Sequence, residues 1–456
     1  MKWVSINPAT EEIISEYIEW STTDLRNTLI KAELASKDWK QSSLNTRLDL
    51  VSNLKKLIQS NRERIATLIT REMGKTFREA NLEVDRAVLF CDHALQRLDH
   101  ILSKVEIPNP LLPASLIREP LGIILAITPW NVPFSTPVRL LLPAVLVGNA
   151  SILKPAPNVA GCAMLFAELF QKAGFPDGLI NIALLNNKLA EELIGDRLIK
   201  KVSFVGSTPV GRRLASIAGH HIKPVLLELG GSDPFIVLDD ADIELAAKDA
   251  AAARCSNAGQ VCCSSKRMII DERVYEQFRE KFLSEMKLKR TGDPMSESVD
   301  YGPLARRDIR DNLITQLEAA VKTGSNIILE GSVVPGQGYF HEPVVLEEPG
   351  EYGFSTDEEF FGPVASLFRA INEEHTVKIA NMSRYGLGSA IYSNNTSRAN
   401  NLAKKLENGF VYINHKPGLH PFIPFGGVKD SGFGKDCGDE AYYEYLSGKV
   451  IVGDVK

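Results

Sequence analysis

Residues 201–213 read KVSFVGSTPVGRR, a pattern that predicts a buried strand, a glycine turn and the start of a helix. We expect the strand at 201–205, with Gly206, Ser207 and Gly211 at the strand-to-helix turn. The match to the G-x-G-x-x-G fingerprint is partial, because the middle glycine is missing, and by itself it is weak. The position of the turn adds weight, since the amino end of the following helix can receive a phosphate. The stretch therefore favours a nucleotide-binding turn.

The same alternation of strand, turn and helix is found before and after residues 201–213. Strands are expected at 122–127, 151–154, 179–184, 201–205 and 225–229, with helices in between. This alternation argues for a parallel α/β sheet of dinucleotide-binding type. A second α/β stretch starts with a strand at 234–238 and an alanine-rich helix at 243–253, and runs to about Lys435. We place a domain boundary near Gly230 and Gly231.

The two ends of the chain have a different character. Most of the first hundred residues are helical in pattern, with apolar residues every three or four positions at 44–58 and 62–72. Four prolines between residues 101 and 120 interrupt short strand-like pieces, which predicts an extended hairpin outside the main body. The tail at 441–452, AYYEYLSGKVIV, is strand-like, and we expect it to pair with this hairpin.

Composition places the protein in a broad class. A chain of 456 residues with 44% apolar residues, 24% charged residues and a net charge of -5 is typical of a globular protein with two domains. No basic patch indicates nucleic acid, no apolar run is long enough for a membrane, and the N-terminus has no secretory pattern. Six sparse cysteines fit a reducing compartment, so we expect a cytoplasmic protein.

Residues 257–267, NAGQVCCSSKR, hold two adjacent cysteines in a polar loop. A thiolate nucleophile needs such a partly open loop, and Gly259 permits close approach of the backbone. Adjacent cysteines chelate metals poorly and the eight histidines show no ligand spacing, so we expect no metal. A disulfide between neighbours would be strained. From this loop alone, Cys262 and Cys263 are either nucleophiles or small core residues.

Two further motifs carry polar groups at the ends of expected strands. In ELGGSDP, Glu228 ends a strand just before Gly230 and Gly231, where a general base is well placed, although a solvent-facing glutamate at a domain joint fits equally. In ITPWNVPF, prolines on both sides hold Trp130 and Asn131 in a rigid loop. The Asn131 amide can donate to a developing oxyanion, or cap its own turn.

Three more segments offer ligand contacts. Lys154 ends a strand in LKPAPN and can contact a ribose or a phosphate. EEFFGPV supplies the carboxylate of Glu359 beside the aromatic ring of Phe361, a pair suited to a ribose. The glycine-dense loop at 424–435, PFGGVKDSGFGK, can close over a site. Each segment taken alone also fits an ordinary turn.

Six of these motifs resemble those of the aldehyde dehydrogenase superfamily closely, and the resemblance spans nearly the whole chain. In chain order they are ITPWNVPF, FVGSTPVGRR, ELGGSDP, NAGQVCCSSKR, EEFFGPV and PFGGVKDSGFGK. The resemblance implies that Cys262, in the pattern GQVC, is the nucleophile, that Asn131 holds the oxyanion and that Glu228 is the general base. It also implies a set of residues that contact the dinucleotide: Thr128, Pro129, Trp130, Lys154, Ala156, Pro157, Gly206, Ser207, Leu229, Gly230, Glu359 and Phe361.

The resemblance further implies an aldehyde dehydrogenase-like α/β fold in three parts. A Rossmann-type dinucleotide-binding domain is expected at 1–100 and 122–229, and an α/β catalytic domain at 230–435. A β-hairpin oligomerisation arm is expected at 101–121 and 436–456. The arm implies a homodimer or a homotetramer.

The coenzyme is NAD or NADP, and one departure from the family leaves the choice open. Many NAD-preferring members have a glutamate three residues after the lysine, which repels a 2′-phosphate. Pro157 stands there in this chain. NADP or dual use is therefore compatible with the sequence.

The substrate prediction rests on Arg139, eight residues after Asn131. It looks like the arginine with which succinate-semialdehyde dehydrogenases grip the far carboxylate, a task that suits a guanidinium. Trp130 and Phe425 are expected to contact the same substrate. A second arginine found in that branch is replaced by Ser256. Succinic semialdehyde is favoured over other aldehydes, while pairing of Arg139 with an acidic neighbour stays an alternative.

Other activities remain open at this point. A CoA-acylating aldehyde dehydrogenase would pass the acyl group to a thiol, but that branch generally lacks the base at Glu228. A catalytically silent protein of the same fold would lack a nucleophile, base or oxyanion donor, and none is missing. A cysteine hydrolase would act without any dinucleotide.

Overall fold

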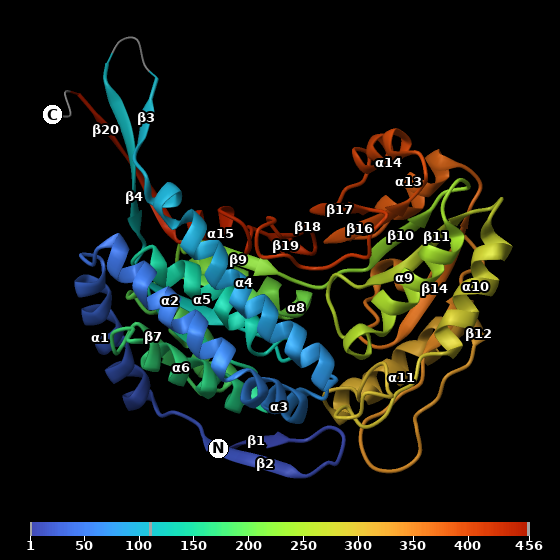
Figure 1. The fold of residues 1–456 in the computed structure, drawn as a ribbon, viewed down its shortest axis with the longest axis horizontal. Coiled ribbons are helices and arrows are strands. Elements are labelled where there is room, and N and C mark those ends of the chain that lie inside the picture. The colour runs from blue at the N-terminus through green and yellow to red at the C-terminus, as the bar shows by residue number, and fades with distance from the viewer. Residues whose placement is uncertain (1, 109–111, 454–456) are drawn as a thin grey trace.

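The computed structural model describes residues 2–108 and 112–453, and it is built on two mainly parallel sheets (Figure 1). The first has six strands in the order β19-β9-β8-β5-β6-β7, of which only β19 is antiparallel to its neighbour. Its strands are β5 (Ile123–Ile127), β6 (Ala150–Lys154), β7 (Ile180–Ile182), β8 (Ile199–Val205), β9 (Val225–Glu228) and β19 (Gly432–Phe433).

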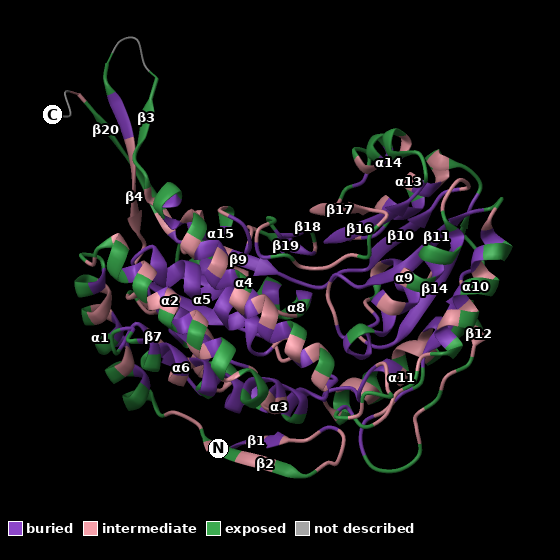
Figure 2. Ribbon diagram, in the orientation of Figure 1, coloured by how far each residue is buried: buried purple, intermediate pink, exposed green. Residues whose placement is uncertain are grey.

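Helices cover both faces of this sheet, so its central strands are buried almost without interruption (Figure 2). They are α1 (Thr22–Trp39), α2 (Leu44–Ser60), α3 (Arg62–Met73), α4 (Phe77–Leu102), α5 (Ser135–Leu146), the 3₁₀ turn η1 (Pro157–Val159), α6 (Ala160–Ala173), α7 (Asn187–Gly195) and α8 (Thr208–His220).

The second sheet has seven strands in the order β12-β13-β14-β11-β10-β16-β17, with β12 antiparallel to β13. Its strands are β10 (Asp233–Val237), β11 (Ser265–Asp271), β12 (Asn326–Leu329), β13 (Val344–Glu347), β14 (Val364–Ala370), β16 (Gly388–Tyr392) and β17 (Phe410–Ile413). The surrounding elements are α9 (Ile243–Cys255), the 3₁₀ turn η2 (Ser256–Gly259), α10 (Tyr275–Lys287), α11 (Arg307–Lys322), α12 (Phe354–Asp357), α13 (Glu373–Asn381) and α14 (Thr396–Ala403).

A third, antiparallel sheet forms an arm that projects from the body (Figure 1). β3 (Val105–Ile107) and β4 (Ala114–Pro120) make the hairpin, and β20 (Leu446–Val452) pairs with β4 along its whole length. The predicted pairing of tail and hairpin is therefore confirmed, except that residues 109–111 and 454–456 of these segments lie outside the described residues.

The α/β prediction is confirmed, and the expected strands and helices of both sheets are present within a few residues. The elements that were not predicted include two strands and a helix near the first sheet. A hairpin of β1 (Lys2–Ile6) and β2 (Ile13–Ile18) opens the chain, and α5 runs through Pro143. The assignment of separate cofactor, catalytic and oligomerisation segments stays a prediction.

The remaining short strands form a separate two-stranded sheet and add an edge strand to the first main sheet. β18 (Val428–Lys429) pairs with β15 (Tyr385–Gly386), and β19 follows and pairs with β9. The glycine-dense loop thus runs from one sheet to the other before α15 (Glu440–Tyr443). Among the helices of residues 2–108 and 112–453, none is long and apolar enough to cross a membrane.

Candidate active site

A cavity of about 920 Å³ lies where the carboxyl ends of β5, β8 and β9 face the loop after α9. It collects most of the residues that the sequence singles out. Those that line it are Pro129, Trp130, Asn131, Arg139, Gly206, Ser207, Glu228, Leu229, Gly230, Cys262, Glu359, Phe361 and Phe425. The cavity is therefore the candidate active site.

The loop that carries Cys262 has an unusual backbone. Asn257, Ala258 and Gly259 follow one another in the left-handed region, with φ of 51°, 54° and 74°. At Gly259 a Cβ would lie 2.1 Å from the carbonyl oxygen of Gly362, so no other residue fits there without movement of the backbone. Such consecutive left-handed residues persist only where the surroundings hold them.

Two buried cations hold this loop. Arg254 donates to the carbonyl oxygens of Gly259 and Gly362, at 2.5 Å each. Lys266 donates to the carbonyl oxygen of Cys262 at 2.5 Å and forms an ion pair with Glu359 at 3.2 Å. The sequence analysis missed both cations, because nothing in the spacing of a basic residue reveals which carbonyl it will bind. They keep the backbone of Cys262 fixed at the cavity wall.

The two thiols share one environment. Cys262 is half-buried, Cys263 is buried, and both line the cavity. Their mutual hydrogen bond raises the pKa of Cys262, with burial adding to the increase, while Lys266 and Arg139 oppose it. Cys263 belongs to the buried core around the first sheet, whereas Cys262 is the more accessible of the two. Cys262 needs a base, or the loss of its bond with Cys263, before it becomes a thiolate.

Asn131 is oriented by the cysteine loop. Its Nδ2 donates to the carbonyl oxygen of Gln260 at 2.9 Å, while Nδ2 of Asn257 donates to the carbonyl oxygen of Asn131 at 3.1 Å. An amide nitrogen carries two N–H groups, so one remains for a ligand in the cavity. The alternative in which Asn131 caps its own turn is not observed.

Glu228 is buried, with 2% of its surface exposed. Among the described residues, neither of its carboxylate oxygens has a hydrogen-bond partner. Burial raises the pKa of Glu228 well above its usual value, the nearby Asp436 adds to the increase, and Arg139 opposes it. A solvent-facing glutamate is thus ruled out, and a buried, unpaired carboxyl in a cavity is the pattern of a functional group.

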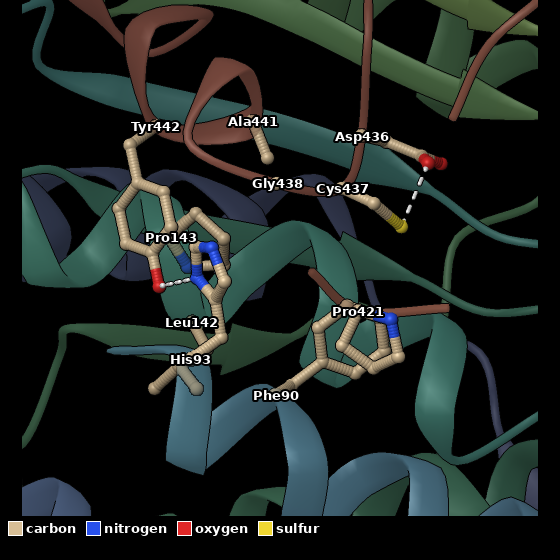
Figure 3. A pocket seen from close by; sticks show the side chains of 10 residues that line it. All are labelled: Phe90, His93, Leu142, Pro143, Pro421, Asp436, Cys437, Gly438, Ala441 and Tyr442. Carbon is tan, nitrogen blue, oxygen red and sulfur yellow. Dashed lines mark hydrogen bonds between the residues drawn. The ribbon is translucent and has the colours of Figure 1, made fainter. Parts of the chain in front are cut away.

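Arg139 is paired rather than free. Its guanidinium lies 2.9 Å from the Asp436 carboxylate, and both side chains are buried. Asp436 also accepts from the Cys437 thiol at 3.5 Å, and Figure 3 shows these two side chains together near Pro421. The pairing with an acidic neighbour, one of the two readings of Arg139, is the one observed. Sequence analysis missed Asp436, which follows the glycine-dense loop without any motif of its own.

Four residues predicted to bind the cofactor do not line the cavity: Thr128, Lys154, Ala156 and Pro157. They lie at or just after the carboxyl ends of β5 and β6, where the backbone N–H of Thr128 donates to the carbonyl oxygen of Lys154 at 3.1 Å. The Lys154 ammonium sits 5.6 Å from the centre of the Trp3 ring, and burial lowers the pKa of Lys154. The role of these four residues stays a prediction.

The profile of the aldehyde dehydrogenase family matches residues 2–451. The chain belongs to the aldehyde dehydrogenase family. A succinate semialdehyde dehydrogenase [NAD(P)+] of Escherichia coli is 37% identical over 452 residues, covering 99% of this chain and 98% of that protein. A probable succinate-semialdehyde dehydrogenase [NADP(+)] of Synechocystis is 35% identical and covers 99% of each chain.

Solved aldehyde dehydrogenases have the same fold. The succinic semialdehyde dehydrogenase of Streptococcus pyogenes, solved in complex with NADP+, superposes with a TM-score of 0.96 at 31% identity. The match covers 98% of this chain and 99% of that one. The expected aldehyde dehydrogenase-like fold is therefore confirmed.

Proposed function

We propose that this aldehyde dehydrogenase oxidises succinic semialdehyde to succinate with NAD or NADP. The observation that carries the proposal is the meeting of Cys262, Asn131 and Glu228 at one cavity. The substrate and coenzyme names of the relatives from Escherichia coli and Streptococcus pyogenes support it.

The cavity suits a dinucleotide at its end near α8. Ser207 caps this helix without a side-chain hydrogen bond, and no acidic residue stands in the first turn. The free N–H groups and the helix dipole there favour a pyrophosphate. Glu359 lines the same cavity and accepts from the backbone N–H of Gly231 at 3.1 Å, so its carboxylate is held in place for ribose hydroxyls. When bound, NAD or NADP supplies the hydride acceptor.

The first chemical step uses the cysteine loop. Cys262 loses its proton to water in the cavity, and the thiolate attacks the aldehyde carbon. The oxygen becomes an oxyanion, which the free N–H of Asn131 and a backbone N–H of the cysteine loop stabilise. Lys266 and Arg139 favour the thiolate, because their charges lower the pKa of Cys262.

Loss of hydride from the carbon leaves a thioester on Cys262. Glu228 then takes a proton from water, and the resulting hydroxide attacks the thioester carbon. The Cys262 sulfur departs as a thiolate, the acid leaves, and Glu228 gives up its proton to solvent, which closes the cycle. The buried position of Glu228 suits this task, since a raised pKa makes its carboxylate a stronger base.

Trp130 and Phe425 are proposed as the apolar walls around the substrate chain. Arg139, with its guanidinium 5.8 Å from the centre of the Phe425 ring, is proposed to set the charge beneath the reacting carbon. As a direct clamp for the far carboxylate it would have to release Asp436.

We also propose a cytoplasmic homodimer or homotetramer in which the arm contacts a second copy. Exposed apolar residues along the arm support this: Val105, Ile107, Val450, Ile451 and Val452. Equilibrium sedimentation of the full chain tests it, and a monomer at micromolar concentration would contradict it.

A panel of kcat/KM values tests the activity. Succinic semialdehyde, butanal and an aromatic aldehyde are each offered with NAD and with NADP, with and without coenzyme A. We expect succinic semialdehyde to be preferred and succinate to form without coenzyme A. Formation of succinyl-CoA only in its presence would favour the acylating reaction, and no reduction of either coenzyme would refute the proposal.

A further inference from the structure

Four lysine or arginine side chains line the cavity: Lys75, Arg86, Arg139 and Lys416. Two of them are neutralised by buried acids. Lys75 pairs with Glu83 at 2.6 Å, and Arg139 pairs with Asp436 at 2.9 Å. Arg86 and Lys416 have no hydrogen bond or ion pair among the residues that the structure describes. A carboxylate that enters the cavity therefore meets two cations, Arg86 and Lys416, that are unpaired among the described residues.

The acids beside Arg86 on α4 are all committed elsewhere. Glu79 accepts from the backbone N–H of Asn257 at 2.6 Å. Asp85 accepts two hydrogen bonds from Arg62. Glu83, besides its bond to Lys75, accepts from the backbone N–H groups at the start of α5. None of these acids neutralises the guanidinium.

The position of Arg86 suits a ligand more than a structural role. It lies on the cavity face of α4, between Leu82 and Leu89, which also line the cavity. Arg86 is half-buried, whereas Lys416 is exposed and therefore more strongly screened by solvent. A hydrogen bond with Cys262 lowers the pKa of Cys263, and the charge of Arg86 contributes to this lowering. Arg86 and the two cysteines thus line the same cavity.

We infer that Arg86 determines specificity for aldehydes with a carboxylate at the far end, by binding that carboxylate while Cys262 holds the aldehyde carbon. The inference rests on the proposed function and deepens it. A guanidinium binds a carboxylate through two parallel N–H groups, which fixes its orientation. Arg139 is a poorer candidate, because taking the substrate would leave the buried Asp436 unpaired.

Methionine at this position tests the inference, because Arg86→Met keeps much of the side-chain length and removes the charge. Values of kcat and KM are measured for succinic semialdehyde and for butanal, which has the same chain length without the carboxylate. Loss of a charge-assisted bidentate contact predicts a fall in kcat/KM of about 10- to 100-fold for succinic semialdehyde, carried by KM, with butanal changed by less than about twofold. Arg86→Lys should retain part of the preference.

The control is Arg78→Met, on the same helix and outside the cavity wall, where the arginine donates to the carbonyl oxygen of Asp300 at 3.5 Å. Arg78→Met should leave kcat/KM unchanged for both substrates. Competitive inhibition by succinate gives a second readout, and we expect Arg86→Met to weaken it by a similar factor.

The two proposals fail in different ways. Suppose that the wild type prefers succinic semialdehyde. If Arg86→Met keeps that preference, or remains folded but loses kcat/KM equally for both substrates, the role of Arg86 is refuted and the proposed function stands. If wild type oxidises butanal but not succinic semialdehyde, the proposed substrate is wrong, and the inference about Arg86 falls with it.

Discussion

Replacing Asp436 by asparagine removes one charge from a buried ion pair and leaves the other in place. The Arg139 and Asp436 side chains are 8% and 0% exposed, and their charged atoms lie 2.9 Å apart. Removing one partner of such a pair typically costs about 3–5 kcal/mol, because a buried charge is left uncompensated. Glu228 is close enough to take over part of the pairing. We therefore expect the free energy of unfolding to fall by about 3 kcal/mol, at the low end of that range.

Urea denaturation of the full chain measures this change. The matched control is Glu244→Gln, which breaks an exposed pair with Lys281, where the two side chains are 76% and 47% exposed. Exposed pairs contribute only about 0–1 kcal/mol, so the control should unfold almost as wild type does. If Asp436→Asn unfolds at the same urea concentration as the control, the buried pair does not contribute to the free energy of unfolding as predicted.

The same variant should change the pH dependence of acid release. Burial raises the pKa of Glu228, and Asp436 adds to the increase while Arg139 opposes it. The variant removes the like charge and frees Arg139, and both effects lower the pKa of Glu228. Since Glu228 acts as a base only when ionised, the rise of kcat with pH should move to lower pH. A move to higher pH would contradict the account of Glu228.

Four further variants test separate parts of the site. Cys262→Ala should abolish aldehyde oxidation, measured as NAD(P)H formation, while Cys263→Ala keeps most of it; reversed effects would mean that the nucleophile is misassigned. Gly259→Ala should destabilise the fold by at least about 2 kcal/mol in urea denaturation, because φ is 74° and the new Cβ would meet the Gly362 oxygen at 2.1 Å. Glu228→Gln should match wild type at acidic pH and be more stable at alkaline pH. The raised pKa of Glu228 means that its ionisation costs stability as pH rises through that value. The melting temperatures of the variant and the wild type are therefore compared at an acidic and an alkaline pH. An equal difference between the two proteins at both pH values would contradict the raised pKa.

Much of the fold follows from local sequence patterns. Strands such as 122–127 and 201–205 are continuous apolar runs between turns, as parallel strands covered on both faces must be. The helix α5 was missed because Pro143 lies inside it. A proline in a helix normally breaks it, but α5 is buried along its whole length, and tertiary packing outweighs the lost hydrogen bond.

The site was predictable where a motif carries the chemistry and not where a long-range contact does. Asn131 and Glu228 stand in recognisable segments at strand ends and Cys262 in a recognisable loop, and the three residues meet at one cavity. The engagement of Arg139 by Asp436 was not predictable, because the two residues lie far apart in the sequence and no spacing rule links them.

The most direct test of the account is to trap the intermediate. Glu228→Gln is mixed with succinic semialdehyde and coenzyme, quenched in acid and digested, and the peptide with both cysteines is sequenced by tandem mass spectrometry. We predict a single burst of about one NAD(P)H per subunit, with a succinyl thioester on Cys262. An unmodified peptide after that burst, or a succinyl group on Cys263, would contradict the proposed mechanism.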